Sequence, residues 1–368
     1  MSKWESIFAK DYCESVRDGT HDTPKPVAIG GKPLVTSKHI KNGEVDFKSA
    51  YHISLEDFDK INERSRVDKW DVLMSMIGTV GECAVIKEEA DYAIKNLALF
   101  KMGGDKNRAL WLYYFLRSPM GQGQLRANYK GASQQFVSLT QLRNLEIPLP
   151  PLPVQRRIAD ILSAYDDLIE NNRRRIAILE ETARLAYSKC FGGMGRCRTT
   201  TLGEIAPFVR GKVITQKNAV HGKVPVVAGG LDPAYFHNMA NTGVPVITIS
   251  GSGANAGFTR MYFEPIWASD CSWCDKSKAK YFYFSYCFLK DNADALRNLQ
   301  QGAAQPHVYP KDINVLEVAL PKSDDLLDNF EESVEPLFSQ CGVLAKQNTA
   351  LAAARDMLLP RLMKGEGA

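Results

Sequence analysis

The sequence predicts an α+β protein in which two β-rich domains are joined by two long antiparallel helices. Three observations indicate this fold class: an internal repeat that covers most of the chain, a long amphipathic helix after each copy, and a length of 368 residues, which exceeds the usual size of one domain. We expect a first β-rich domain at 1–150, a central helix at 151–195, a second β-rich domain at 196–321 and a C-terminal helix at 322–368.

The repeat is visible in three collinear matches. Residues 125–150 align without a gap on 296–321, 171 residues further on, with 10 identities in 26 positions. At an offset of 173, residues 111–117 match 284–290 and residues 74–79 match 247–252. Because the matches keep their order and nearly equal offsets, we expect two copies of one unit, related by a pseudo-two-fold axis.

Each copy leads into a long helix. In the first, apolar residues between Ile158 and Tyr187 recur at spacings of three and four, after the proline-rich segment 148–153 and before Phe191-Gly192-Gly193. In the second, the apolar stripe runs from Phe330 to Leu362, Ser323 is the expected N-cap, and Pro336 predicts a kink or a break. About 36 residues give a helix of about 54 Å. Such a helix needs a partner, so we expect the two to pair antiparallel as a coiled-coil rod.

Composition and local patterns limit the class of protein. With 45% hydrophobic and 24% charged residues the chain reads as a soluble globular protein. We find no apolar run long enough to span a bilayer and no signal-peptide pattern at the start, so we expect the cytoplasm. The eight cysteines show no disulfide-framework spacing, which favours free thiols in a reducing compartment.

Patterns of known catalytic sites are missing from the sequence. The glycine-rich segment 250–257 is followed by an alternating, strand-like pattern instead of the helix that a nucleotide loop needs. The Cys271-Ser272-Trp273-Cys274 motif has no second pair at zinc spacing, which favours buried free cysteines. The aromatic segments 111–115 and 281–284 are expected in the core instead of stacking on bases. We therefore predict a chain with no catalytic residue, no metal and no cofactor of its own.

The repeat and its helices resemble the specificity subunit of type I restriction-modification systems. The segment 147–180 looks like the central helix of that family, and 358–366 looks like its C-terminal end. The strand and turn at 74–81 and the Gly-Ala-Ser-Gln and Gly-Ala-Ala-Gln loops at 131–134 and 302–305 look like elements of its target recognition domains. The resemblance extends over essentially the whole chain.

The resemblance implies a DNA-binding, non-catalytic subunit. Each target recognition domain would read one half of a bipartite, asymmetric site in double-stranded DNA, and the helical rod would set the gap between the halves. The rod would also dock two modification (methyltransferase) subunits, which use S-adenosylmethionine for adenine DNA methylation, while restriction subunits would bring ATP, Mg and cleavage. Two alternatives stay open: a recognition subunit of a methylation-only complex, and a helical scaffold that binds no DNA.

Base reading needs donors and acceptors at exposed turns, and phosphate binding needs Lys, Arg or backbone amides there. The two β-rich domains carry net charges of only +2 and +4, so individual loops matter more than the total. Our DNA-binding candidates in the first domain are Lys38, Lys41, Thr79, Lys130, Ser133, Gln134 and Gln135. Those in the second domain are Arg210, Lys212, Ser252, Asn255, Arg260, Gln305 and His307. On the helices, Tyr165, Ile169, Leu344 and Leu351 are candidates for binding partner helices.

Overall fold

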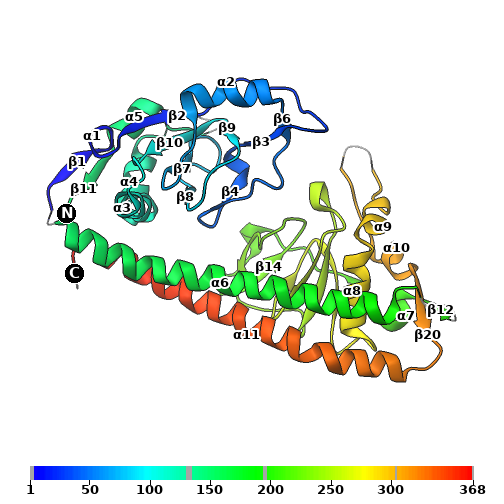
Figure 1. The fold of residues 1–368 in the computed structure, drawn as a ribbon. Helices are drawn as coiled ribbons and strands as arrows, with labels where there is room; N and C mark the ends of the chain where they lie inside the picture. The colour runs from blue at the N-terminus through cyan, green and yellow to red at the C-terminus, as the bar shows by residue number, and fades with distance from the viewer. Residues whose placement is uncertain (1–3, 130–134, 194–196, 303–304, 367–368) are drawn as a thin grey trace. The chain divides into compact units, whose positions relative to one another are not determined.

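The computed structural model describes residues 4–129, 135–193, 197–302 and 305–366, and the chain divides into two compact units. Unit 1 comprises residues 1–168 and 351–368, and unit 2 comprises 169–350. Each unit therefore contains one β-rich copy of the repeat together with part of both long helices, as the ribbon in Figure 1 allows the reader to follow.

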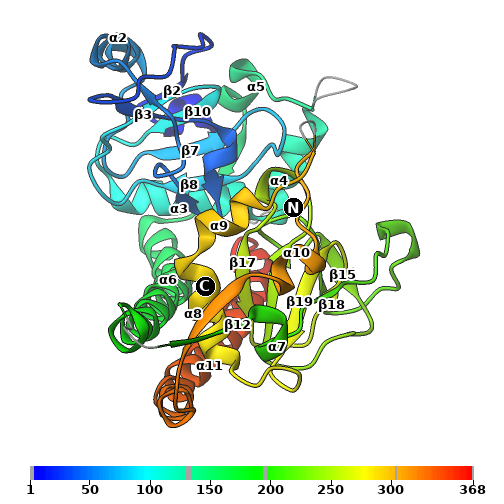
Figure 2. The same ribbon diagram turned by 90° about the vertical axis from the view of Figure 1, so that its right-hand side faces the viewer.

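Unit 1 is built from short strands and helices followed by the start of a long helix. In chain order these are β1 (Ser6–Phe8), α1 (Ala9–Tyr12), β2 (Ser15–Asp18), β3 (Lys32–Val35), η1 (Ser37–His39), β4 (Ile40–Lys41), β5 (Glu44–Val45), β6 (His52–Ile53), α2 (Leu55–Ser65), β7 (Val72–Ser75), β8 (Cys83–Val85), β9 (Ala93–Ile94), β10 (Leu97–Lys101), α3 (Lys106–Arg117), α4 (Pro119–Ala127), α5 (Leu139–Arg143), β11 (Glu146–Pro148) and α6 (Leu152–Phe191). Its main sheet has the strand order β2-β10-β7-β8, which Figure 2 shows side by side.

Unit 2 repeats this plan. Its elements are β12 (Cys197–Thr201), α7 (Leu202–Ile205), β13 (Val209–Arg210), η2 (Gln216–Asn218), β14 (Val224–Val227), β15 (Tyr235–His237), β16 (Val246–Ser250), η3 (Gly253–Asn255), β17 (Thr259–Tyr262), β18 (Trp267–Ala268), β19 (Cys271–Asp275), α8 (Phe282–Asp291), α9 (Ala293–Asn298), α10 (Pro310–Asn314), β20 (Glu317–Pro321) and α11 (Asp325–Leu362). Its main sheet, β13-β19-β16-β17, has the order of the main sheet of unit 1.

The remaining sheets correspond as well. The antiparallel pair β1-β11 matches β12-β20, and the three-stranded sheet β6-β3-β9 matches β15-β14-β18, with one antiparallel and one parallel pairing in each. Helix α2 and the hairpin β4-β5 have no helix or strand at the corresponding place among the described residues of unit 2. The predicted fold class and its internal repeat are therefore confirmed at the level of topology.

Each unit buries an aromatic helix against its main sheet. Residues 109–116 of α3 are all buried, and residues 282–287 of α8 are buried too, which confirms the expected core role of both aromatic segments. The two long helices complete these cores. The core of unit 1 includes Ile158 and Leu162 of α6 with Leu359 and Leu362 of α11. The core of unit 2 includes Ala183 and Phe191 of α6 with the α11 residues Leu327, Phe330, Val334 and Phe338.

The long helices run antiparallel within each unit. In unit 1, Arg355 of α11 forms an ion pair with Asp166 of α6. In unit 2, the Asn172 amide of α6 donates to Asn348 of α11 at 3.0 Å, so the partner position on α11 falls as the position on α6 rises. Of the kink or break expected at Pro336, the break is wrong, because α11 continues as one helix from Asp325 to Leu362, and the kink stays a prediction. The buried side chains of Val334 and Phe338 on either side hold this turn against the core.

Both helix starts agree with the capping rules. Pro153 lies in the first turn of α6, where a missing amide costs no helical hydrogen bond. The expected N-cap of α11, Ser323, is one residue off: the helix begins at Asp325, so Asp324 holds the cap position, and the Ser323 hydroxyl accepts the Asp325 amide at 3.2 Å just before it. In the described part of the chain, no helix combines the length and the apolar character that crossing a bilayer would require.

Candidate nucleic-acid interface

In unit 1, the turn after β7 is hydrogen-bonded to the segment that precedes α5. The Gly78 amide donates to the Gln135 carbonyl at 3.2 Å, and the Val137 amide donates to the Met76 carbonyl at 3.0 Å. The Gly81 amide closes the turn on the Ser75 carbonyl at 3.1 Å. Two segments that are more than fifty residues apart therefore meet at one edge of the main sheet.

Unit 2 repeats these bonds. The Gly253 amide donates to the Pro306 carbonyl, and the Val308 amide donates to the Gly251 carbonyl, both at 3.0 Å. The turn closes through the Gly257 amide on the Ser250 carbonyl at 2.9 Å. We call this edge, formed by 76–82 with 135–137 in unit 1 and by 251–258 with 305–308 in unit 2, the loop edge.

The hydrogen bonds correct the alignment of the two copies. Gly78 and Gly253 occupy the same place and have φ values of 80° and 78°, a conformation that favours glycine. Their offset is 175, whereas the sequence match of 74–79 with 247–252 used 173. A shift of two residues leaves each strand side chain on the same face of the sheet, so the sequence match paired the right strands in the wrong register. Ser252 therefore corresponds to Ile77 and not to Thr79.

The loop edge continues across the neighbouring strands. The Gly19 amide donates to the Leu97 carbonyl at 2.9 Å, and the Gly211 amide donates to the Cys271 carbonyl at 2.8 Å. A Cβ on Gly19 would lie 2.4 Å from the Ile94 carbonyl oxygen, so the backbones meet here without room for a side chain. These bonds make Asp18 the counterpart of Arg210, and Asn96 the counterpart of Asp270.

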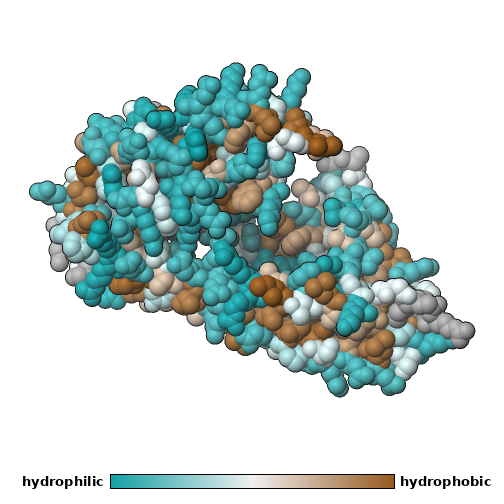
Figure 3. Space-filling model, in the orientation of Figure 1, coloured by the Kyte–Doolittle hydropathy of each residue, from teal (hydrophilic) through white to brown (hydrophobic). Residues whose placement is uncertain are grey.

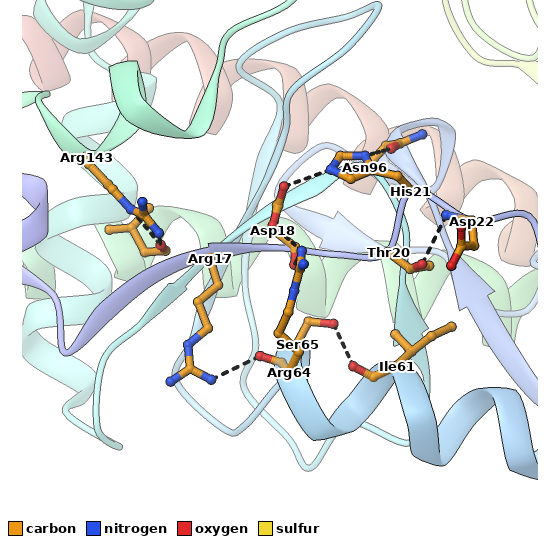
Figure 4. A network of polar contacts seen from close by, with 11 residues as sticks. Arg17, Asp18, Thr20, His21, Asp22, Ile61, Arg64, Ser65, Asn96 and Arg143 are labelled. Carbon is orange, nitrogen blue, oxygen red and sulfur yellow. Dashed lines mark hydrogen bonds and ion pairs between the residues drawn. The ribbon is translucent and has the colours of Figure 1, made fainter.

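In unit 1, Asp18 is the centre of a polar network, which Figure 4 shows. Its carboxylate forms an ion pair with Arg64, which α2 supplies. The His21 ring lies between Asp18 and Asn96, with Nε2 3.0 Å from Asp18 Oδ2 and Nδ1 2.8 Å from Asn96 Oδ1. Arg17 in turn donates to the Arg64 carbonyl at 3.0 Å. The end of β2 therefore presents a hydrogen-bonded cluster in which an acidic residue is central.

In unit 2, the same place holds an arginine. Arg210 Nη2 lies 3.4 Å from Asp270 Oδ1, and the Ser252 hydroxyl donates to the other carboxylate oxygen of Asp270. The Arg210 guanidinium also lies over the Tyr309 ring, 5.7 Å from its centroid. The His307 ring stacks on Tyr309 at 5.9 Å with an interplanar angle of 15°.

Several predicted DNA-binding residues therefore come together. Ser252 and His307 face each other in a β-bridge, and Asp270 connects Ser252 to Arg210. Thr79 and Gln135 are exposed on the two segments of the loop edge of unit 1, and Gln305 is exposed beside Pro306 in unit 2. Guanidinium, imidazole, hydroxyl and amide groups at an exposed edge are the groups that read base edges.

The other candidates are less closely joined. Asn255 ends η3 just after the bridge, and Arg260 donates to the Leu231 carbonyl at 2.9 Å. Lys212 follows β13 with an exposed side chain. Lys38 and Lys41 are exposed beside the β4-β5 hairpin, whose turn residue Gly43 approaches Tyr113 of α3. Lys130, Ser133 and Gln134 lie outside the described residues. The DNA-binding role of each candidate stays a prediction.

Sequence reasoning missed the side chains that support this edge. Asp270 and Tyr309 in unit 2, and Asp18, His21, Arg64 and Asn96 in unit 1, were not among the candidates. A weak signal existed, because both Asp18 and Arg210 stand directly before a glycine at the end of a short strand. The strands β2 and β13 are too short for period-two alternation to reveal them, so their pairing is visible only in the structure.

The helix positions proposed for partner binding fall into two classes. Ile169 and Leu344 are only 5% and 1% exposed, so their side chains are used inside the chain and leave no surface for a partner. Tyr165 and Leu351 are partly exposed and stay predictions. In Figure 3, brown hydrophobic residues are interspersed among teal ones along α6 and α11. The exposed large apolar side chains of these helices are Leu152, Leu168, Ile178, Leu185, Leu326, Val343 and Met357.

The Cys271–Cys274 motif lies on β19. Residues three apart on a strand point to opposite faces, and accordingly Cys271 packs with Val246 and Trp273 while Cys274 packs in the core beneath α8. Burial raises the pKa of both thiols to about 12. The two sulfurs therefore cannot act as a pair. Among the described residues, no group of three or more His, Cys, Asp or Glu is placed to hold a metal ion.

The comparisons with known proteins agree with this architecture. Residues 1–181 match the model of the type I restriction modification DNA specificity domain. The chain is 27% identical over 274 residues to a protein of Methanocaldococcus jannaschii named as the MjaX type I restriction enzyme specificity subunit, covering 72% of this chain and 62% of that one. It therefore spans less than two thirds of that relative.

Two further proteins are similar over nearly their whole length. The type I restriction enzyme MjaIX specificity subunit of M. jannaschii is 23% identical, with 99% of this chain and 93% of that one covered. The crystal structure of the type I restriction-modification system S subunit from M. genitalium has the same fold, with 20% identity, a TM-score of 0.54 and coverage of 98% and 96%. The first part of the chain, residues 1–181, therefore carries the type I restriction modification DNA specificity domain, and the chain as a whole has the fold of the M. genitalium S subunit.

Proposed function

We propose that this chain is the sequence-specific DNA-recognition subunit of a type I restriction-modification complex, and that each unit reads one half of a bipartite, asymmetric site. The observation that carries the proposal is the loop edge: two units of one topology present it through the same backbone hydrogen bonds but with different side chains. Reading two different half-sites requires a scaffold that the two units share and edge side chains that differ between them.

In this proposal the chain supplies recognition and its partners supply the chemistry. Modification subunits bring S-adenosylmethionine and transfer its methyl group to adenine, and restriction subunits bring ATP, Mg and cleavage. The names of the relatives support this division, because they are specificity subunits of restriction enzymes. A complex that only methylates would use the chain in the same way.

The first test is to coexpress the chain with the modification subunit encoded beside it and to map adenine methylation across a host genome. We expect a two-part asymmetric motif with a gap of fixed length. A stable complex that forms but leaves the genome unmethylated would contradict the proposal, and a chain that assembles proteins without retaining any DNA would favour the scaffold alternative.

The helix pair is proposed to fix that gap. Seven residues, about two helical turns, inserted into both α6 and α11 near the facing residues Asn172 and Asn348 lengthen the pair by about 10 Å, close to three base pairs. We expect the preferred gap to grow by about three base pairs while both half-sites stay the same. An insertion of equal length at the exposed Glu88-Glu89 bend is the control. A gap that stays unchanged in the helix variant would refute the spacer role.

A further inference from the structure

Arg210 differs from an ordinary exposed arginine because its side chain is held in place. Its side chain is 51% exposed, yet Asp270 pairs with Nη2 and the Tyr309 ring lies beneath the guanidinium. Resting on the proposed function, we propose that Arg210 reads a guanine in the half-site bound by unit 2, and that Asp270, Ser252 and Tyr309 are its positioning residues.

The residues that position Arg210 come from three separate segments of the chain. Asp270 precedes β19 and is itself fixed, because one carboxylate oxygen accepts from Ser252 and its backbone carbonyl accepts the Gly251 amide at 3.1 Å. Tyr309 precedes α10, and its own ring is stacked on by the His307 ring, 5.9 Å away. An arginine held in this way loses less side-chain freedom on binding, which favours a contact of defined geometry.

The charge balance favours a base over a phosphate. Phosphate contacts gain their affinity from net positive charge and counterion release. The Arg210–Asp270 pair has no net charge, so it offers little of this gain. Its directional N–H donors remain useful, because a guanidinium carries five of them in a planar fork and the Asp270 contact engages Nη2 alone. The O6 and N7 atoms of guanine in the major groove accept such a fork through two hydrogen bonds.

The corresponding place in unit 1 cannot make this contact. Asp18 replaces Arg210, and a carboxylate accepts hydrogen bonds instead of donating them. The guanine preference that Arg210 provides is therefore confined to one half-site, which gives the experiment an internal reference in the other.

The test uses the full chain coexpressed with its modification subunit and the methylation map of the host genome. We expect the wild-type motif to contain a G·C pair in the half-site read by unit 2. In Arg210→Ala and Arg210→Lys, discrimination at that one base pair should fall about 10- to 100-fold, because a lone ammonium cannot form the bidentate contact. The other half-site and the gap should be unchanged, which also shows that the variants fold and assemble.

Arg198→Ala is the matched control, since Arg198 and Asp324 form another partly exposed arginine–aspartate pair of unit 2, on β12 and away from the loop edge. It should methylate the wild-type motif. Asp270→Asn should relax the same position as Arg210→Ala, by a smaller factor, because it loosens the arginine without removing it.

Two results would overturn the assignment. If Arg210→Ala keeps the wild-type motif with full discrimination at every position, Arg210 reads no base. If it lowers methylation evenly at all sites and reduces the salt dependence of DNA binding by about one counterion, Arg210 contacts a phosphate. If the wild-type complex methylates no motif at all, the proposed function itself fails, and this inference fails with it.

Discussion

The two units have the same strand order but place opposite charges at the same position of the loop edge. Unit 1 ends β2 with Asp18, which pairs with Arg64 from α2, whereas unit 2 ends β13 with Arg210, which pairs with Asp270. The surrounding backbone bonds of Gly19 and Gly211 are nevertheless the same. The backbone hydrogen bonds, which the two units share, therefore specify the fold, whereas the side chains of the loop edge differ between the units without changing it.

A second difference lies at the opposite ends of the same strands. In unit 1, Lys101 of β10 faces Asp71, whose carboxylate is 1% exposed and also accepts the amides of Asp68 and Met102. In unit 2, Asp275 stands in the place of Lys101 and lies opposite Val246, which stands in the place of Asp71. The Asp275 carboxylate accepts the Gly243 amide at 3.0 Å and the Ser277 hydroxyl at 2.6 Å. Unit 1 alone therefore depends on a buried ion pair at this position.

The largest effect is expected from breaking that pair. Burial raises the pKa of Asp71 and Lys101 lowers it, so Lys101→Met leaves a buried carboxylate without its cation. We expect a loss of about 3 to 5 kcal/mol in the stability of unit 1, seen as faster hydrogen exchange of the β7 and β10 amides. The control is Lys87→Met, whose pair with Asp167 is exposed and should cost less than about 1 kcal/mol. Equal losses in the two variants would show that the buried pair has no special role.

A smaller effect is expected at the loop edge of unit 1. Asp18→Ala and Arg64→Ala should alter base preference in the half-site that unit 1 reads, by about 5- to 10-fold, because Asp18 holds the His21 ring against Asn96 and Arg64 holds Asp18. The half-site of unit 2 should be unaffected. Methylation mapping of the coexpressed complex measures both at once, with Arg66→Ala, from an exposed pair outside the network, as control. A change in both half-sites would contradict the independence of the two units.

The two units also differ in how their aromatic helices begin. Asp105 caps α3 locally by accepting the Asn107 and Arg108 amides. Tyr281 provides no side-chain cap for α8, and Glu331 of α11 accepts the Tyr283 and Phe284 amides instead. Burial raises the pKa of Glu331 to about 7, against the lowering effect of these two amides and of Lys276, while Glu335 adds to the rise. The distant cap therefore makes unit 2 sensitive to pH.

The direction of this sensitivity follows from the folded-state pKa, which is higher than the usual value of 4.5. The folded chain then holds the proton more tightly than the unfolded chain, so Glu331 destabilises unit 2 as pH rises from about 4.5 to about 7, by at most about 1.4 kcal/mol per pH unit. We expect Glu331→Gln to flatten the decline of Tm between pH 5 and 8. Changing the exposed neighbour Glu332 to Gln should not alter the dependence of Tm on pH. If Tm of Glu331→Gln declined with pH as steeply as that of the wild type, the role of this carboxyl group would be refuted.

The sequence predicted the parts of this molecule that repeat or alternate over long stretches. The stripe of α6, the end of that helix at Phe191 and the core role of the aromatic segments all follow from periodicity, which many residues reinforce. The loop edge was predicted only in part. Ser252 and Arg210 were selected as exposed polar residues, but their connection through Asp270 depends on the pairing of a two-residue strand, and periodicity cannot identify so short an element.

The sharing of both long helices between the cores affects how the chain can fold during synthesis. Ile158 and Leu162 of unit 1 pack with Leu359 and Leu362, which are made about 200 residues later. At about 5 to 20 residues per second, the ribosome needs about 10 to 40 s to deliver these last partners. Throughout that interval the nascent first unit carries an uncovered apolar surface, so it is exposed to aggregation until the final turns of α11 emerge, and slower translation lengthens that exposure.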